Sequence, residues 1–226
     1  MSDVLLRNIE RLSAHTLAHE ELRAAHHFLY DLRFPRSGSP EYVVMGVNPG
    51  ETPGDWALSR TPTEETSRFD FHEELGPGRS SIRWTSSARY FLGGADYVLT
   101  ELFFWSSKDS REFEARFGKL ASSPHLQLCV DMNRDLIEAY QPRAVILPGL
   151  ANHELCRSIY GLRHEETVRH GEVRVAERYT DGRRPWLFTK HWTASFGFSK
   201  EQRQAVRDQI CGLAGAPILS AAVEIA

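Results

Sequence analysis

Four short apolar runs along the chain are typical of strands buried in a parallel sheet. The runs are residues 42–47, 97–104, 144–147 and 186–189. Segments with helical spacing of apolar residues lie between and after them, at 81–92, 125–140, 150–160 and 199–213. Strands that alternate with helices favour an α/β fold with helices on both faces of the sheet. We therefore expect a three-layer α/β/α sandwich around a central, mainly parallel four-stranded sheet.

The flanking segments complete a single predicted domain that spans residues 1–226. Residues 1–35 form a helical extension, bent around 13–19, residues 40–212 form the core, and 214–226 are an apolar tail. A further hairpin strand is expected at 172–179. Residues 51–80 are rich in Gly, Pro and Thr and are longer than a typical connection, and such loops are often functional.

Composition narrows the class of protein without naming a function. The chain has 226 residues, 41% hydrophobic and 25% charged, which is ordinary for a soluble domain. Its three cysteines form no CxxC pair, which argues for a reducing compartment and against a zinc or iron–sulfur cluster. No signal peptide is apparent and no apolar run reaches the roughly 18 residues of a membrane span. We expect a cytoplasmic, monomeric protein without a membrane partner.

The charge balance favours nucleic-acid binding only locally. The formal net charge of −3 is slightly adverse to a nucleic-acid binder. Basic residues nevertheless cluster in two groups, and a local basic face can bind phosphates. The groups are Arg79, Arg83 and Arg89, and Arg183, Arg184 and Lys190.

The first apolar run ends in the sequence Gly-Val-Asn-Pro-Gly at residues 46–50. Ligands of open α/β sheets bind at the carboxyl ends of the strands, so this turn delivers Asn48 to the edge where a site forms. An amide carries both a donor and an acceptor and can hold a water molecule in line for attack. The alternative is that Asn-Pro-Gly is turn chemistry alone.

Three motifs in this order resemble the uracil-DNA glycosylase superfamily. Residues 46–50 are similar to its first motif, in the Asn-containing form of the thymine/mismatch-specific and single-strand-selective branches. Residues 129–137 and 142–151 resemble its helix and "PKVIVLLGxxA" strand. Residues 190–199 resemble its second catalytic motif, normally His-Pro-Ser followed by a wedge loop. The resemblance covers about residues 40–212.

The resemblance implies hydrolysis of the bond between a flipped base and its deoxyribose in DNA, without metal or cofactor. Asn48 would position the water, with Asp55 polarising it, and His191 would stabilise the departing base anion. For His191 the alternative is a surface or capping histidine. Gly46 and Val47 would line the base.

The second motif departs from the family pattern because His191-Trp192-Thr193 replaces His-Pro-Ser. The resemblance implies that this loop contacts DNA and fills the stack that the flipped base leaves. The expected DNA-contacting residues are Lys190, Trp192, Thr193, Ser195, Phe196 and Phe198. For the two phenylalanines, core packing at the start of the last helix is the alternative.

The second predicted strand contains Thr100-Glu101, where many family members have Thr-Asn. An ionised carboxylate only accepts hydrogen bonds, whereas the exocyclic amine of cytosine donates them. Glu101 therefore favours a substituted cytosine over uracil. The alternative is a strand-end glutamate paired with an arginine.

The 51–80 loop is expected to complete the base pocket, with Phe69 or Phe71 as an aromatic platform. Its length suggests a bulky substrate, such as a sugar-bearing cytosine of phage DNA, and a defence role. The alternatives are repair of uracil or mismatched thymine, a non-catalytic module that binds DNA or a modified nucleotide, and hydrolysis of free nucleosides.

Histidines near the N-terminus give a weak metal signal. His15 and His19 have helical i, i+4 spacing, and His26 and His27 follow. Two histidines so spaced can bind zinc, but the sequence shows no third ligand. A solvated helix face is the interpretation that the sequence favours, and no metal is predicted.

Overall fold

The computed structural model describes residues 3–23, 39–50, 80–193 and 197–214. These residues form an α/β fold built on one six-stranded, mostly parallel sheet with the strand order β2-β1-β3-β6-β5-β4. The strands are β1 (Tyr42–Gly46), β2 (Tyr97–Glu101), β3 (Ala144–Pro148), β4 (Arg163–His170), β5 (Val173–Thr180) and β6 (Pro185–Thr189).

The four predicted strands form the parallel half of this sheet. β1 pairs in parallel with β2 and β3, and β3 pairs in parallel with β6. All four carboxyl ends therefore meet at one edge. β5 is antiparallel to β6 and to β4. The hairpin of β4 and β5 therefore adds two strands to the four-stranded sheet that was expected.

The sequence of β4 explains why the hairpin was predicted only in part. It reads Arg-His-Glu-Glu-Thr-Val-Arg-His, and within it only Val168 is buried. A strand at the edge of a sheet needs no apolar run, and charged side chains there discourage pairing with another chain. Apolar periodicity therefore marks β5, which lies inside the sheet, and not β4.

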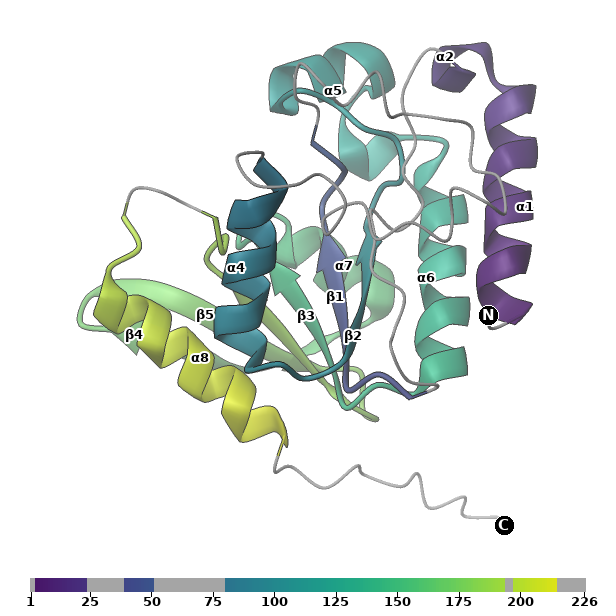
Figure 1. The fold of residues 1–226 in the computed structure, drawn as a ribbon. Helices are drawn as coiled ribbons and strands as arrows, with labels where there is room; N and C mark the ends of the chain where they lie inside the picture. The colour runs from purple at the N-terminus through teal and green to yellow at the C-terminus, as the bar shows by residue number, and fades with distance from the viewer. Residues whose placement is uncertain (1–2, 24–38, 51–79, 194–196, 215–226) are drawn as a thin grey trace.

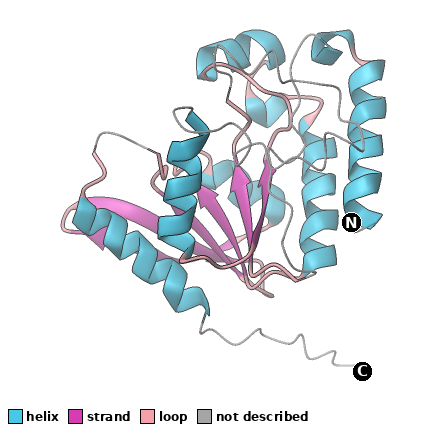
Figure 2. Ribbon diagram, in the orientation of Figure 1, coloured by secondary structure: helices cyan, strands magenta, loops and turns pink. Residues whose placement is uncertain are grey.

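Helices flank the sheet on both faces (Figures 1 and 2). Tyr42 donates a hydrogen bond to the Ile210 carbonyl of the last helix, whereas Met45 contacts the hydroxyl of Tyr160. Side chains three apart on a strand point to opposite faces, so these helices cover opposite sides. The helices are α1 (Asp3–Ala18), α2 (Glu20–Arg23), α4 (Ser80–Leu92), α5 (Ser110–Phe117), α6 (Leu126–Tyr140), α7 (His153–Tyr160) and α8 (Lys200–Ala214), with a 3₁₀ turn, η3 (Leu120–Ser122).

The predicted helices agree with the structure within the described residues, apart from the short elements after β2, and the predicted helical extension lies outside the described residues beyond Arg23. The expected bend in the N-terminal helix lies at His19, between α1 and α2. Helix α5 was missed because its apolar residues are few, but Asp109 marks its start by accepting a hydrogen bond from the amide of Glu112. No helix in the described ranges combines the length and the apolar character that a membrane span requires.

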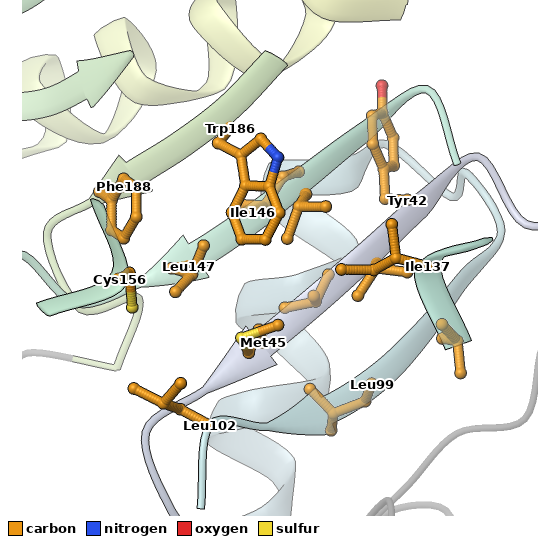
Figure 3. Packing of buried hydrophobic residues seen from close by; sticks show 14 of the residues in the cluster. Tyr42, Met45, Leu99, Leu102, Ile137, Ile146, Leu147, Cys156, Trp186 and Phe188 are labelled. Atoms are coloured by element: carbon orange, nitrogen blue, oxygen red, sulfur yellow. The ribbon is translucent and has the colours of Figure 1, made fainter. Parts of the chain in front are cut away.

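The core lies between the sheet and the helices (Figure 3). Ile146 of β3 is fully buried at the centre of the sheet, and Trp186 of β6 is 2% exposed. The ring of Trp186 packs against Tyr160 of α7, with 4.7 Å between ring centroids. Burial of such large apolar side chains is the main favourable term in folding, which fixes the strands that carry the site.

One buried polar residue joins helix α6 to the end of β2. Asn133 accepts a 2.6 Å hydrogen bond from the Thr100 hydroxyl and donates a 2.8 Å hydrogen bond to the Glu101 carbonyl. The Leu102 amide bonds to Gly46 of β1, so the preceding Glu101 carbonyl points away from β1. Asn133 thus satisfies a carbonyl at the outer side of an edge strand.

We expect Asn133→Ala to lower the free energy of unfolding by about 1–3 kcal/mol, because it leaves buried polar groups without this partner. Urea unfolding measures the change. Gln127→Ala, at an exposed position of the same helix, is the control and should change stability little. Equal effects of the two substitutions would contradict the assigned role of Asn133.

Candidate functional site

The candidate site lies at the carboxyl edge of the parallel strands. Asn48 follows β1 by two residues, and His191 follows β6 by two residues. β3 lies between these strands, and neighbouring strands are about 4.8 Å apart, so the two strand ends are roughly 10 Å from each other.

Asn48 is held in one orientation by its amide. Its Nδ2 donates to the Pro49 carbonyl at 3.0 Å and to Ser107 Oγ at 2.9 Å. The carbonyl can only accept, and the Ser107 hydroxyl donates its own hydrogen to the Asp109 carbonyl, so both partners require the NH₂ group. The carbonyl oxygen Oδ1 is then the acceptor that Asn48 offers to a ligand.

The backbone holds Ser107 beside Asn48. The Ser107 amide donates to the Pro49 carbonyl at 3.1 Å, and Gly50 and Ser107 form an isolated parallel bridge. The pairing of β1 with β2 thus continues past the strands into the turn. The sequence analysis did not identify Ser107. The feature that could have indicated it is the polar pair Ser106-Ser107, which directly follows the apolar residues 102–105.

Gly46 and Glu101 form the second group of the site. They are register partners in β1 and β2, and Glu101 is only 6% exposed. A Cβ at position 46 would lie 2.0 Å from Glu101 Oε2 and 2.7 Å from its Cδ. The glycine is therefore required because the Glu101 carboxylate occupies the space of a side chain.

His191 is oriented by the residue two positions later. The Thr193 amide lies 3.4 Å from His191 Nδ1, and the Thr193 hydroxyl lies 3.0 Å from the same nitrogen. An amide N–H only donates, so Nδ1 is the acceptor and Nε2 carries the proton of the neutral ring. Although the side chain is exposed, desolvation by the surrounding protein lowers the pKa of His191 below its ordinary value of 6.5.

The segment after His191 is anchored in the core. Trp192 is fully buried and stacks between Trp84 and Phe91, with centroid distances of 5.5 and 5.0 Å. Its carbonyl accepts hydrogen bonds from Ser87 and Arg203. The DNA contact predicted for Trp192 is thus not supported, because its indole is a core group that fixes the backbone beside His191.

Two other expected DNA contacts are used within the chain. Phe198 is 8% exposed and stacks on Phe91, so it is a core residue, as the alternative for this phenylalanine held. The Lys190 ammonium donates to the Gly197 carbonyl and to Gln202. Among the described residues of this loop, Thr193 and His191 keep accessible side chains.

Several predicted site residues lie outside the described ranges, so their placement does not enter the argument. These are Asp55, Phe69, Phe71, Ser195 and Phe196, together with His26 and His27. Val47 is described and lies between Gly46 and Asn48. Its carbonyl accepts a 2.9 Å hydrogen bond from the Phe103 amide, which again extends the pairing of β1 with β2.

Two arginines of the second predicted basic group make ion pairs and hydrogen bonds within the chain. Arg183 pairs with Glu138 at 3.0 Å, and Arg184 donates to the Ile137 carbonyl and to Gln141.

The buried thiol of Cys129 is not a reactive group, since burial raises its pKa to about 12. Among the described residues, the groups at the strand edge are an amide, a carboxylate, an imidazole and hydroxyls.

Neither a scan of protein-family models nor a search of curated proteins finds a match to this chain.

We expect Gly46→Ala to lower the free energy of unfolding by about 1–3 kcal/mol, because the new methyl group forces the Glu101 carboxylate out of its position. The same substitution in a Glu101→Ala background should cost clearly less. Urea unfolding of the four proteins of this cycle measures the coupling. Gly212→Ala, with no atom within 4 Å of the added Cβ, is the control. A cost that is the same in both backgrounds would show that Glu101 is not the obstacle.

Proposed function

We propose that this protein is a DNA glycosylase that hydrolyses the N-glycosidic bond of a flipped base and leaves an abasic site. The observation that carries the proposal is the fixed amide of Asn48, whose two N–H groups are engaged by Pro49 and Ser107. The order of three motifs along the chain, which resembles the uracil-DNA glycosylase superfamily, supports the same reaction.

The reaction needs a water molecule placed on the face of the sugar opposite the base. The bond between C1′ and the base nitrogen breaks as positive charge develops on the sugar, and the water oxygen then bonds to C1′. Asn48 Oδ1 accepts a hydrogen from that water and thereby holds it in line. A preorganised amide needs no rearrangement during the reaction, which is where its catalytic benefit arises.

The departing base carries the electron pair of the broken bond. His191 Nε2–H donates a hydrogen bond to the exocyclic oxygen of the base as negative charge develops there, and keeps its proton. The neutral tautomer that Thr193 favours is the one that presents this N–H. The anion finally takes the proton that the attacking water loses, so the reaction consumes one water and needs no redox partner.

The substrate we favour is a cytosine that carries a substituent, in keeping with a defence role against DNA with modified bases. Glu101 lies over Gly46, within two residues of Asn48, and its carboxylate accepts hydrogen bonds from an amine. Cytosine offers such an amine and uracil does not. Uracil or mismatched thymine is the alternative substrate class within the same reaction.

A non-catalytic module that binds DNA or a modified nucleotide is the alternative from another class. Base stacking and phosphate contacts are sufficient for binding, so such a module requires no oriented acceptor for water. The double hydrogen bonding of the Asn48 amide therefore favours catalysis over binding alone.

The test is base release from a DNA panel that contains uracil, T:G, cytosine, hydroxymethylcytosine and glucosylated hydroxymethylcytosine. We expect abasic sites in substituted-cytosine DNA, and a loss of about 10²–10³ in kcat for Asn48→Ala. Release from uracil or T:G DNA would keep the reaction and refute the cytosine preference. Tight DNA binding with no release from any substrate would refute the glycosylase and support the binding module.

Ser107→Ala tests whether Ser107 positions Asn48. It removes one of the two acceptors of the Asn48 amide, so kcat should fall by roughly tenfold while KM changes little. Ser122→Ala, at an exposed hydroxyl of η3, is the matched control and should leave kcat unchanged. An equal effect of the two variants would remove Ser107 from the site.

The pH dependence of kcat tests the neutral His191. Its pKa is lowered, so the ring is neutral at pH 7 and should lose activity only as the pH falls through that pKa, below 6.5. An enzyme that required the imidazolium would instead lose activity as the pH rises through the same pKa. His191→Asn, which keeps a donor that does not titrate in this range, should abolish the acid limb. An unchanged acid limb in this variant would assign it to another group.

A further inference from the structure

Three histidines that are far apart in the sequence meet beside the N-terminal helix. His15 lies in the last turn of α1, His19 follows that helix, and His125 immediately precedes α6. The ring centroids are 4.3, 4.9 and 5.2 Å apart, and one nitrogen from each ring lies within 4.8 Å of the others. His125 is the third ligand that the sequence could not reveal.

The contacts of the rings show which nitrogens face one another. His15 Nε2 lies 3.0 Å from His125 Nδ1, so these two nitrogens share one hydrogen at most. The other nitrogen of His125, Nε2, lies 3.2 Å from Glu21 Oε1. The same carboxylate oxygen lies 3.4 Å from His19 Nδ1, which leaves Nε2 as the ligand atom of His19.

Glu21 therefore takes the place that a carboxylate has behind the histidines of metal sites. Histidines that bind a metal almost always donate their other N–H to a carboxylate, a carbonyl or water, which fixes the tautomer. One carboxylate here serves two of the three rings. Within the described residues, this is the group of histidines that could hold a metal ion.

Two rings of the cluster pack against one buried aromatic side chain, Trp105. His125 is 3% exposed and packs against Trp105, with 5.6 Å between ring centroids. The ring of His15 also contacts Trp105, with 5.8 Å between ring centroids.

We infer that His15, His19 and His125 bind one divalent transition-metal ion, with Zn²⁺ the favoured occupant and a water molecule as the fourth ligand. Zinc accepts three imidazoles in a tetrahedral site with an open position. Its bonds to histidine are about 2.0–2.1 Å long, so ligand nitrogens sit a little over 3 Å apart. The three ligand nitrogens, which lie within 4.8 Å of one another, would have to move closer together to reach that geometry.

The ion would join α1 to the start of α6 and add to the polar contacts along this interface. Elsewhere along this contact Arg11 pairs with Asp135 at 2.7 Å, and Asn8 donates to the Met132 carbonyl at 3.1 Å. The cluster extends this row to the beginning of α6. Metal binding should therefore stabilise the docking of α1, and this inference holds whether or not the protein is a glycosylase.

The experiment is a zinc titration of the full-length protein after dialysis against a chelator, by competition with a chromogenic chelator. We expect one Zn²⁺ per chain and a melting temperature that rises with zinc concentration. Cobalt(II) in place of zinc should give the intense visible absorption of a tetrahedral site. Failure to bind zinc or cobalt at the cluster would overturn the inference without bearing on base release.

Variants distinguish the cluster from the other seven of the ten histidines in the chain. His19→Ala should weaken zinc binding by at least tenfold, and Glu21→Gln by roughly 10–100-fold. His170→Ala, at an exposed position of β4, is the matched control and should bind zinc like the unaltered protein. Equal binding by all three variants would show adventitious binding elsewhere and overturn the inference.

Discussion

The parallel pairing of β1 with β2 is the constraint on which the candidate site depends. Its register places Gly46 beside Glu101, and the same pairing runs on through the turn to join Gly50 with Ser107. A shift of one residue would turn the Glu101 side chain to the opposite face of the sheet. The Glu101 carboxylate lies over Gly46, so a side chain at position 46 would have to displace it. The pairing of β1 with β2 therefore determines both the contact of Gly46 with Glu101 and the position of the Asn48 amide.

Apolar periodicity predicted the parallel half of the sheet and most of the helices, because burial imposes it on those elements. The signal failed for β4, whose side chains are charged and exposed at the sheet edge, and for α5, which is short. It also overestimated the second strand, expected at 97–104. The chain after Glu101 remains buried and apolar through Trp105, so hydrophobicity alone could not show where the strand ends.

The candidate site was predictable where it depends on strand ends and not where it depends on contacts across the sequence. Positions at three strand ends identify Asn48, Glu101 and His191 as candidates. Ser107 could not be found, because its role depends on a hydrogen bond to a residue 59 positions away. Trp192 was assigned to DNA for its large aromatic face, yet the same face makes it a core group between Trp84 and Phe91. An aromatic residue in a loop can pack in the core or contact a ligand, and the tertiary structure is needed to distinguish these roles.

The segment 105–107 connects the two sites that the structure presents. Trp105 packs against His15 and His125, and its indole N–H donates to Thr16 of α1 at 3.1 Å. Two residues later, Ser107 accepts the hydrogen bond from Asn48. One three-residue segment therefore supplies both the aromatic ring that packs against α1 and the hydroxyl that holds the amide of Asn48.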